Sequence, residues 1–347
     1  MKPALLAVMT AALLSSMALA QESDWTIDSR TLPAPAGASD DLRAAIAKTP
    51  QPDIARYIKY TTFMTSEEWV QSIRAANAGS TQRAEALAKR WSVTIKEDKI
   101  AGVTVRTVTP ADIDPMNENR LFVHVHGGAY VLNGGSAGLP EAILIANWAK
   151  ISVMSIDYRM PPEHPFPAAV DDVVAVWKSL LRDRPAKSMA LGGTSAGGGL
   201  TLASTLQFME LRVETPGALW VGTPWADLTK TGDSQFTNEG IDRMLVTYDG
   251  LLEGAAKLYA NGRDLKTPLI SPIYGKFKGF PPTYLVTGTR DLFLSDTARV
   301  HRKMRVAGVV ADLNVYEGIS HGEYMVESPE SQQAYGELGA FLLQHLQ

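Results

Sequence analysis

A serine between small residues is the first feature of the sequence that could do chemistry. Ser195 lies in the run Gly193-Thr194-Ser195-Ala196-Gly197, which has the G-x-S-x-G pattern of a strand-to-helix turn that exposes a nucleophilic hydroxyl. Glycine suits the positions two before and two after the serine, because a side chain there would collide with the backbone of so sharp a turn. A glycine-rich loop without function has the same letters, so these five residues alone leave both interpretations open.

A serine nucleophile needs a base that accepts its proton and an acid that orients the base. His321, in Gly318-Ile319-Ser320-His321-Gly322, is the predicted base. It follows a strand, lies in a loop and comes after the serine, as in the order Ser, acid, His of α/β-hydrolases. The remaining histidines lie inside a strand, in a glycine turn, before the serine, on a charged helix face and at the chain end: His124, His126, His164, His301 and His345.

The acid is predicted at the end of a strand between these two residues. Asp291 follows the apolar segment 284–286 and leaves the sheet at its carboxyl edge, where the sites of open α/β sheets gather. Asp296 is the alternative. It lies beside Ser295 at the start of a predicted helix, where its charge suits the helix dipole, so we favour Asp291.

Donors for a negatively charged oxygen are predicted in two places. His126-Gly127-Gly128-Ala129 ends a strand and offers main-chain N–H groups from Gly127, Gly128 and Ala129, the last provided that its φ is negative. Ala196 adds the N–H next to the nucleophile. An ordinary glycine turn is the competing interpretation of residues 126–129.

Hydrophobic periodicity predicts the elements that must hold these residues. Alternating segments from Trp91 and from Val103 to Val108 indicate half-buried antiparallel strands. Strands and helices then alternate, which predicts a mostly parallel sheet covered on both faces. The predicted strands are 121–125, 151–156, 189–191, 219–221, 283–286 and 313–316, and the predicted helices are 41–48, 66–78, 81–90, 168–181, 196–211, 248–259, 295–307 and 332–346.

The domain organisation follows from the same pattern. Residues 1–20 have the positive start, short apolar run and small-residue end of a signal peptide, with cleavage after Ala20. Residues 21–90 are predicted as an N-terminal helical cap segment and 91–347 as the catalytic domain. Residues at about 230–266 form an insertion too long for a plain loop, which we predict to complete the cap.

Composition narrows the classes of function. The net charge of −4 provides no basic surface for nucleic acid. The chain has no cysteine, which excludes disulfides and thiolate metal sites. The apolar run of residues 4–14 is shorter than a membrane span, so we favour a cleaved signal peptide over the alternative, an uncleaved membrane anchor. We therefore expect export, to the periplasm or the medium, without a stable membrane span once the signal is removed.

Several ordered motifs together resemble the hormone-sensitive-lipase-like family of α/β-hydrolase carboxylesterases. They are the segments His126–Tyr130, Asp157–Ala169, Gly193–Gly197 and Pro224–Thr229, with the acid and histidine segments. Many relatives have aspartate where this chain has Thr194, so it is most similar to the sub-branch with threonine there. Many also have a third glycine where Ala129 stands, and we expect esters of bulky tertiary alcohols to fit less well here.

The resemblance implies an eight-stranded sheet, a helical cap and hydrolysis of short- to medium-chain esters without a cofactor or metal. Ser195 would be the nucleophile, His321 the base and Asp291 its partner, while Tyr130 and Trp225 are candidates for lining the substrate pocket. A lactonase or amidase with the same triad is the alternative activity, and a non-catalytic ligand-binding protein on this scaffold is another. The partner is a small-molecule ester, and the sequence leaves a homodimer open.

Overall fold

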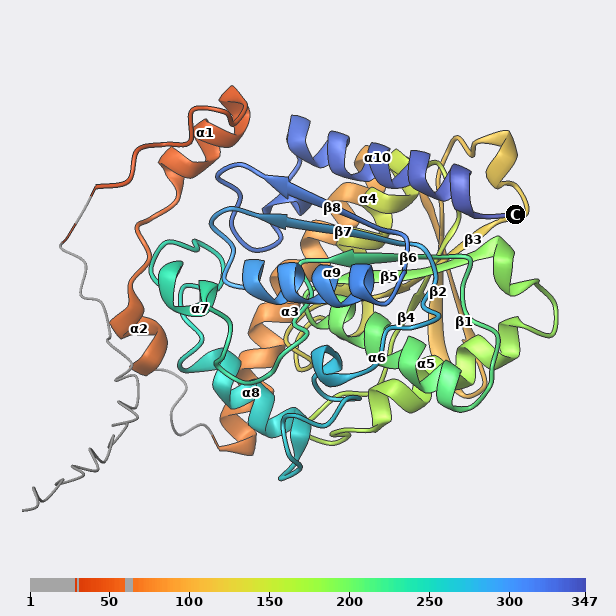
Figure 1. Cartoon of the computed structure of the whole chain (residues 1–347). Coiled ribbons are helices and arrows are strands. Elements are labelled where there is room, and N and C mark those ends of the chain that lie inside the picture. Colours follow the sequence, from red (N-terminus) through yellow and green to blue (C-terminus); the bar gives the residue numbers. More distant parts are fainter. Residues whose placement is uncertain (1–28, 30, 60–64) are drawn as a thin grey trace, which may run out of the picture. The chain divides into compact units, whose positions relative to one another are not determined.

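The computed structural model of the chain describes residue 29 and residues 31–59 and 65–347. Residues Ala34–Gln347 form one compact unit, drawn in Figure 1, and the fold described here is that unit. The predicted signal peptide, residues 1–20, lies outside the described residues. No helix in the described part is long and apolar enough to cross a membrane.

An eight-stranded sheet runs through the unit in the order β1-β2-β4-β3-β5-β6-β7-β8. The first two strands and the pair β2–β4 are antiparallel, whereas the pairs from β4 to β8 are parallel. The predicted mostly parallel sheet is therefore confirmed. The strands are β1 (Thr94–Ile100), β2 (Val103–Thr109), β3 (Leu121–Val125), β4 (Val153–Ile156), β5 (Met189–Thr194), β6 (Ala218–Gly222), β7 (Thr283–Gly288) and β8 (Ala311–Tyr316).

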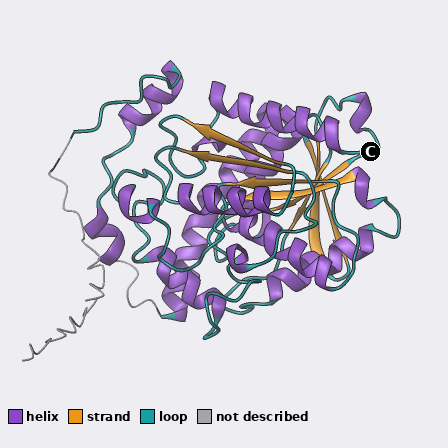
Figure 2. Cartoon of the chain, in the orientation of Figure 1, coloured by secondary structure: helices purple, strands orange, loops and turns teal. Residues whose placement is uncertain are grey.

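Helices cover both faces of this sheet (Figures 1 and 2). α4 (Leu139–Ala149) and α10 (Pro329–His345) pack together on one face, while α5 (Ala168–Leu180), α6 (Ala196–Glu210) and α9 (Leu294–Val306) cover the other. Each face buries its own hydrophobic cluster. Neighbouring strand residues alternate between the clusters, as Phe122 and Val123 do, because successive side chains of a strand point to opposite faces.

Two further groups of helices lie outside these layers. The N-terminal group comprises α1 (Asp40–Lys48), α2 (Ile54–Lys59) and α3 (Ser66–Arg90), and the insertion carries α7 (Ser234–Thr237) and α8 (Leu251–Ala260). Short 3-10 turns occupy η1 (Pro115–Asn117), η2 (Gly135–Gly138), η3 (Ala186–Ser188), η4 (Pro272–Tyr274) and η5 (Glu323–Met325).

The structure differs from the sequence predictions about these elements in three ways. The helices predicted at 66–78 and 81–90 are one helix, α3, which begins with a capping box between Thr65 and Glu68. Helices α2, α4 and α7 were not predicted. β1 was predicted as half-buried, but it is almost wholly exposed.

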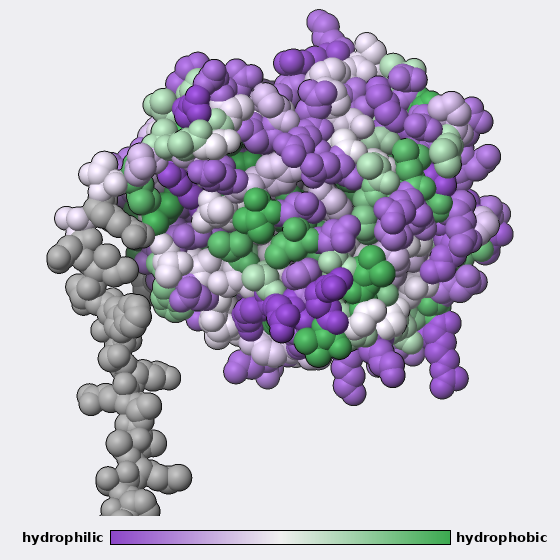
Figure 3. Space-filling model, turned by 45° about the horizontal axis from the view of Figure 1, so that its top comes forward, coloured by the Kyte–Doolittle hydropathy of each residue, from purple (hydrophilic) through white to green (hydrophobic). Residues whose placement is uncertain are grey.

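The surface is mostly hydrophilic on the face drawn in Figure 3, where hydrophobic residues form small groups that hydrophilic residues separate. The exposed large hydrophobic side chains include Phe236 and Met244 on the insertion. Single exposed apolar residues are normal for a folded protein, so most of this surface needs no partner to explain it.

Candidate active site

Ser195 lies on the sharp turn between β5 and α6. Its φ of 64° and ψ of −122° are a backbone conformation that non-glycine residues rarely adopt. Hydrogen bonds hold it there: the Ser195 N–H donates to Gly222 O (2.8 Å), and Ser195 O accepts from the N–H of Gly199 (3.0 Å) and Trp225 (2.9 Å). Ser195 is partly exposed between buried neighbours, so the turn presents its side chain outward.

The two motif glycines are required by close approach of another strand. A Cβ atom at Gly193 would lie 1.9 Å from the carbonyl oxygen of Val125, and one at Gly197 would lie 2.1 Å from the same oxygen. The collision predicted for a larger residue is thus with the end of β3. This contact brings the nucleophile turn against the segment that follows β3. That segment, residues 126–129, offers the predicted oxyanion donors and is called the donor turn below.

The predicted acid and base lie in direct contact. Nδ1 of His321 lies 3.1 Å from Oδ1 of Asp291, and both residues are buried. Since a carboxylate only accepts, Nδ1 carries the proton and Nε2 is left as the acceptor. This is the tautomer that a general base needs.

Asp291 is held by several donors besides the histidine. Its Oδ1 accepts from the N–H of Phe293 (2.7 Å), and its Oδ2 accepts from the hydroxyls of Thr287 (3.2 Å) and Thr223. Thr223 was not predicted, although its position directly after β6 was a usable signal, because site residues gather where parallel strands end.

Opposing effects act on the imidazole of His321. Burial disfavours its charged form, but the charge of Asp291, the hydrogen bond between them and the charge of Asp242 together raise the pKa of His321 above its ordinary value. The site therefore stabilises the imidazolium that forms when a base accepts a proton.

The donor turn after β3 touches the nucleophile turn. A Cβ atom at Gly127 would lie 2.7 Å from Thr194 O and 3.3 Å from Ser195 Cβ. Gly127, Gly128 and Ala129 all line the cavity that contains Ser195, and Ala196 is the first residue of α6, whose N–H cannot take part in the helical ladder.

Ala129 does not meet the condition set for it. Its φ is +53°, whereas its inclusion among the donors required a negative φ. The following residue, Tyr130, also has a positive φ, of 63°, because the chain turns back here and the N–H groups of Val131 and Leu132 donate to Gly128 O. Gly127, Gly128 and Ala196 remain as the candidate donors.

His126 supports this turn. Its Nδ1 lies 2.8 Å from Gly127 O, its ring stacks on Tyr158 with centroids 4.2 Å apart, and the Tyr158 hydroxyl donates to His126 O at 2.7 Å. Burial lowers the pKa of His126 to about 4, so the ring is neutral at neutral pH. The segment after β4 therefore fixes the donor turn, and Arg159 in that segment pairs with Asp172.

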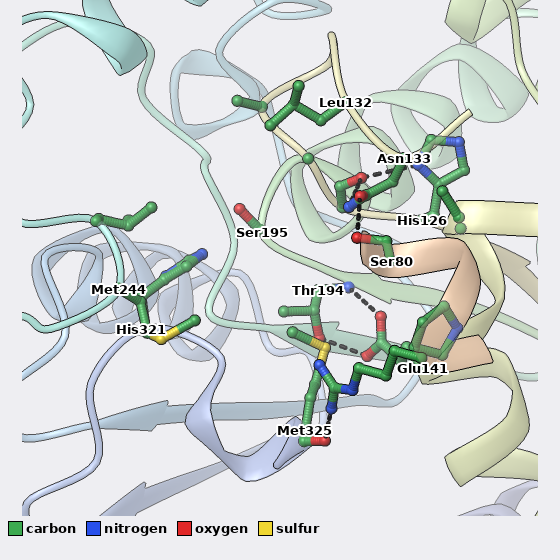
Figure 4. A pocket seen from close by; sticks show the side chains of 18 of the residues that line it. Ser80, His126, Leu132, Asn133, Glu141, Thr194, Ser195, Met244, His321 and Met325 are labelled. Atoms are coloured by element: carbon green, nitrogen blue, oxygen red, sulfur yellow. Dashed lines mark hydrogen bonds between the residues drawn. The ribbon is translucent and has the colours of Figure 1, made fainter. Parts of the chain in front are cut away.

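Ser195 and His321 line one cavity of about 270 Å³. In Figure 4, Ser195 stands between Met244 and His321 on one side and Ser80 and Asn133 on the other. Ser80 comes from α3, and the apolar residues Met244, Leu245, Leu251 and Leu252 come from the insertion. The structure thus places residues of both predicted cap segments on the cavity wall.

The two predicted pocket aromatics are core residues instead. Tyr130 and Trp225 are buried and are not among the residues that line the cavity. Tyr130 stacks on Tyr259 with centroids 4.0 Å apart, and Trp225 stacks on Phe293 at 5.7 Å. Each turns into the hydrophobic cluster beneath the site because aromatic packing there buries its whole ring.

A buried carboxylate behind the nucleophile turn was not predicted. Glu141, on α4, accepts hydrogen bonds from the N–H and hydroxyl of Thr194, from Nε1 of Trp220 (3.1 Å) and from Nε2 of His124 (3.2 Å). Thr194 also bonds the hydroxyl of Tyr324 at 2.8 Å. The residue before the nucleophile is therefore held from both α4 and the segment that follows His321.

Asp296, the alternative acid, is not the carboxylate that bonds His321. Its Oδ2 accepts from the N–H groups of Ala226 (3.0 Å) and Asp227 (2.8 Å). Burial and the charge of Asp227 raise the pKa of Asp296 to about 8, so the expected favourable interaction of a charged group with the helix dipole does not describe it. Among residues 31–59 and 65–347, no group of three acidic or histidine residues could hold a metal ion.

Comparisons with known proteins identify the family of the chain. A profile of the alpha/beta hydrolase fold matches residues 122–325. An acetyl-hydrolase of Streptomyces hygroscopicus is 32% identical over 244 residues, which are 69% of this chain and 81% of the relative.

Solved structures extend the likeness over more of the chain. The crystal structure of an esterase E25 is 55% identical, with a TM-score of 0.92 over 93% of this chain and 99% of that one. An esterase from the bacterial hormone-sensitive lipase (HSL) family is 27% identical, with a TM-score of 0.69 over 82% and 100%. The resemblance drawn from the sequence motifs is confirmed, and the chain belongs to the α/β-hydrolase fold family, among proteins similar to the hormone-sensitive-lipase esterases.

Proposed function

We propose that this protein is a serine carboxylesterase that cleaves small esters through an acyl-enzyme intermediate. The observation that carries the proposal is the placement of Ser195, on a strained turn, in the same cavity as His321, whose Nδ1 is held by Asp291. A nucleophile, a base of the required tautomer and main-chain donors then surround one space in which an ester carbonyl would lie.

The proposed reaction has two steps. The Ser195 hydroxyl attacks the ester carbonyl while Nε2 of His321 takes its proton, and the imidazolium then gives that proton to the leaving alcohol. Water attacks the acyl-enzyme in the second step, with His321 again as the base, and releases the acid and the free serine. The N–H groups of Gly127, Gly128 and Ala196 would stabilise the oxyanion of both tetrahedral intermediates.

The size and lining of the cavity favour a substrate with a short- to medium-chain acyl group. Its volume of about 270 Å³ lies at the small end of ligand pockets, and the insertion gives it an apolar wall. A lactonase or amidase would use the same groups in the same geometry, so these activities are the alternatives within this chemistry. Binding without catalysis is the alternative of another class, and the presence of His321 beside Asp291 argues against it.

Hydrolysis of a p-nitrophenyl ester series, from acetate to dodecanoate, tests the proposal. The wild-type protein should hydrolyse the short esters fastest, and Ser195→Ala should lose at least about 10³-fold in kcat. Ser204→Ala is the matched control: the Ser204 hydroxyl is buried on α6 and has no partner among the described residues, so the variant should keep wild-type activity. Equal turnover by wild type and Ser195→Ala would refute the esterase, and a lactone and an anilide assayed beside the esters separate the alternatives.

The predicted export and the homodimer rest on the sequence alone and stay predictions. Mass spectrometry of the exported protein should find Gln21 at its start.

A further inference from the structure

We propose that Asp242 is a positioning residue for the triad: its buried carboxylate joins the acid and histidine loops to the cap insertion and places a second negative charge beside His321. The acid loop here means residues 288–293 and the histidine loop means residues 318–323. The proposal deepens the esterase function above and rests on it.

The hydrogen bonds of Asp242 reach three segments. Its Oδ1 accepts from the N–H groups of Met244 (2.8 Å) and Leu245 (3.1 Å) in the insertion. Its Oδ2 accepts from the N–H of Leu292 (2.8 Å), the residue after Asp291, and lies 3.4 Å from the N–H of His321. One fully buried carboxylate therefore fixes the main chain next to the acid and that of the base itself.

The neighbouring Arg243 strengthens the same attachment. Its main-chain N–H donates to the Ser320 hydroxyl (3.1 Å), and its guanidinium donates to Gly318 O (3.1 Å) and to both carboxylate oxygens of Glu323. Glu323 in turn accepts from the N–H of Ser320 (2.7 Å). The Arg243–Glu323 pair is buried, where an ion pair with several hydrogen bonds fixes geometry because breaking it leaves a buried charge uncompensated.

The same short segment continues into the substrate cavity. Met244 and Leu245 follow Asp242 and Arg243 directly and line the cavity with Ser195. The apolar wall that would hold an acyl group and the loop that carries the base therefore share one attachment. A small displacement of a reacting group can lower a rate about 10²-fold, so this attachment is a means of keeping the base in line.

The charged groups that act on Asp242 are Asp291 and His321. The loops that it bonds also carry Arg290 and Glu323, and Arg243 follows it in sequence. Burial and the charge of Asp291 raise the pKa of Asp242 to about 6, against the opposing effects of His321 and the backbone donors. Above that pH the carboxylate is ionised. Its charge then adds to that of Asp291 in favouring the imidazolium of His321.

The variant Asp242→Asn tests the proposal, because it keeps the size of the side chain while removing the charge and turning one acceptor into a donor. We expect kcat to fall about 10-fold or more with KM within about twofold. We also expect the acid limb of kcat/KM against pH to move to lower pH by about half a unit or more. The sign follows because loss of a nearby negative charge makes His321 easier to deprotonate. Asp249→Asn is the matched control, since Asp249 pairs with Lys230 on the same insertion and should leave both kcat and the limb unchanged.

An NMR titration of the His321 imidazole provides a readout that does not require turnover. In Asp242→Asn its pKa should be lower than in the wild type by the same half unit or more, and in the wild type its signals should show a second inflection from Asp242. The wild-type titration decides the proposal even where Asp242→Asn does not fold. A single wild-type inflection, or a folded variant whose imidazole pKa equals that of the wild type, would overturn the role of Asp242. A wild-type protein that hydrolyses no ester would instead overturn the proposed function.

Discussion

Replacement of Glu141 by glutamine tests whether the carboxylate behind the nucleophile turn holds it in place. Glu141 is buried and accepts from four donors: the N–H and hydroxyl of Thr194, Nε1 of Trp220 and Nε2 of His124. A carboxylate can accept all four bonds at once. Glutamine has the same shape but only one oxygen, and its NH2 group must face donors.

The size of the effect follows from which donors can adapt. With the NH2 group in the place of Oε2, His124 can become an acceptor by passing its proton to the nitrogen beside Ser155, but the N–H of Thr194 cannot. With the NH2 group in the place of Oε1, the Thr194 hydroxyl can accept and donate onward to Tyr324, but Nε1 of Trp220 cannot. Either arrangement leaves one buried donor without an acceptor, which costs about 1–3 kcal/mol. The bonds that remain lose the assistance of the charge, so we expect Glu141→Gln to destabilise the protein by about 2–4 kcal/mol.

Urea unfolding at pH 7, followed by tryptophan fluorescence, measures this loss. Glu163→Gln is the control, because Glu163 is exposed and its change should stay within about 0.5 kcal/mol. Thr194→Val, made in the wild type and in Glu141→Gln, should show a coupling of about 1 kcal/mol or more between the two positions. If Glu141→Gln unfolds within 0.5 kcal/mol of the wild type, the carboxylate is not the required acceptor and this reasoning is wrong.

Three further predictions follow from the site. The pKa of His321 is raised, and the base must be neutral to accept a proton. We therefore expect the acid limb of kcat/KM against pH to have its midpoint above the ordinary histidine value of about 6.5. A measured midpoint below that value would contradict the assignment of His321 as the base. The pKa of Asp296 is about 8 in the folded protein, above its ordinary value of 3.8, so the folded state favours its protonated form. As the pH rises from about 4 to 8, the free energy of unfolding of the wild type should therefore fall, whereas that of Asp296→Asn should not show this loss. Denaturant unfolding at both ends of the range measures the difference, and an equal change in the two proteins would contradict the prediction. Ala129→Gly removes a methyl group at a residue with φ of +53° and should raise the rate on a tert-butyl ester relative to an ethyl ester without loss of stability; an unchanged ratio in gas-chromatographic product assays would exclude Ala129 as the obstacle.

The sheet could be predicted from the sequence because its strands are short apolar runs between clear turn residues. Prediction failed where a local signal competed with packing. Gly79 and Ser80 look like a helix break, yet α3 continues through them, because its contacts with α4 and η2 outweigh the cost of about 1 kcal/mol for glycine within a helix. In α4, nine of eleven residues are buried, so it lacks the polar face that identifies a surface helix.

In the site, too, some residues could be predicted from local sequence signals and others could not. Ser195, Asp291 and His321 were predictable because each follows a strand and the chain order of the three is informative. Asp242 and Glu141 have no such signal, since the site residues that they bond, Leu292 and His321 for Asp242 and Thr194 for Glu141, lie about 50 to 80 positions away along the chain. Spacing in sequence says nothing about such contacts, which exist only once the sheet has brought distant turns together.

Glu141 gives a physical reason for the threonine inside the nucleophile motif. The pattern G-x-S-x-G leaves the second position free, but in this fold Thr194 places its hydroxyl on the carboxylate of Glu141 and against the hydroxyl of Tyr324. An aspartate there, as in many relatives, would set a second carboxylate against the first in a buried space, and one of the two would have to bind a proton. Thr194 avoids that because it is neutral and can donate to Glu141 while accepting from Tyr324. Glu141 on α4 therefore favours a neutral hydrogen-bond donor at position 194. A change of Thr194 or of Glu141 should be tolerated only together with a change of the other residue.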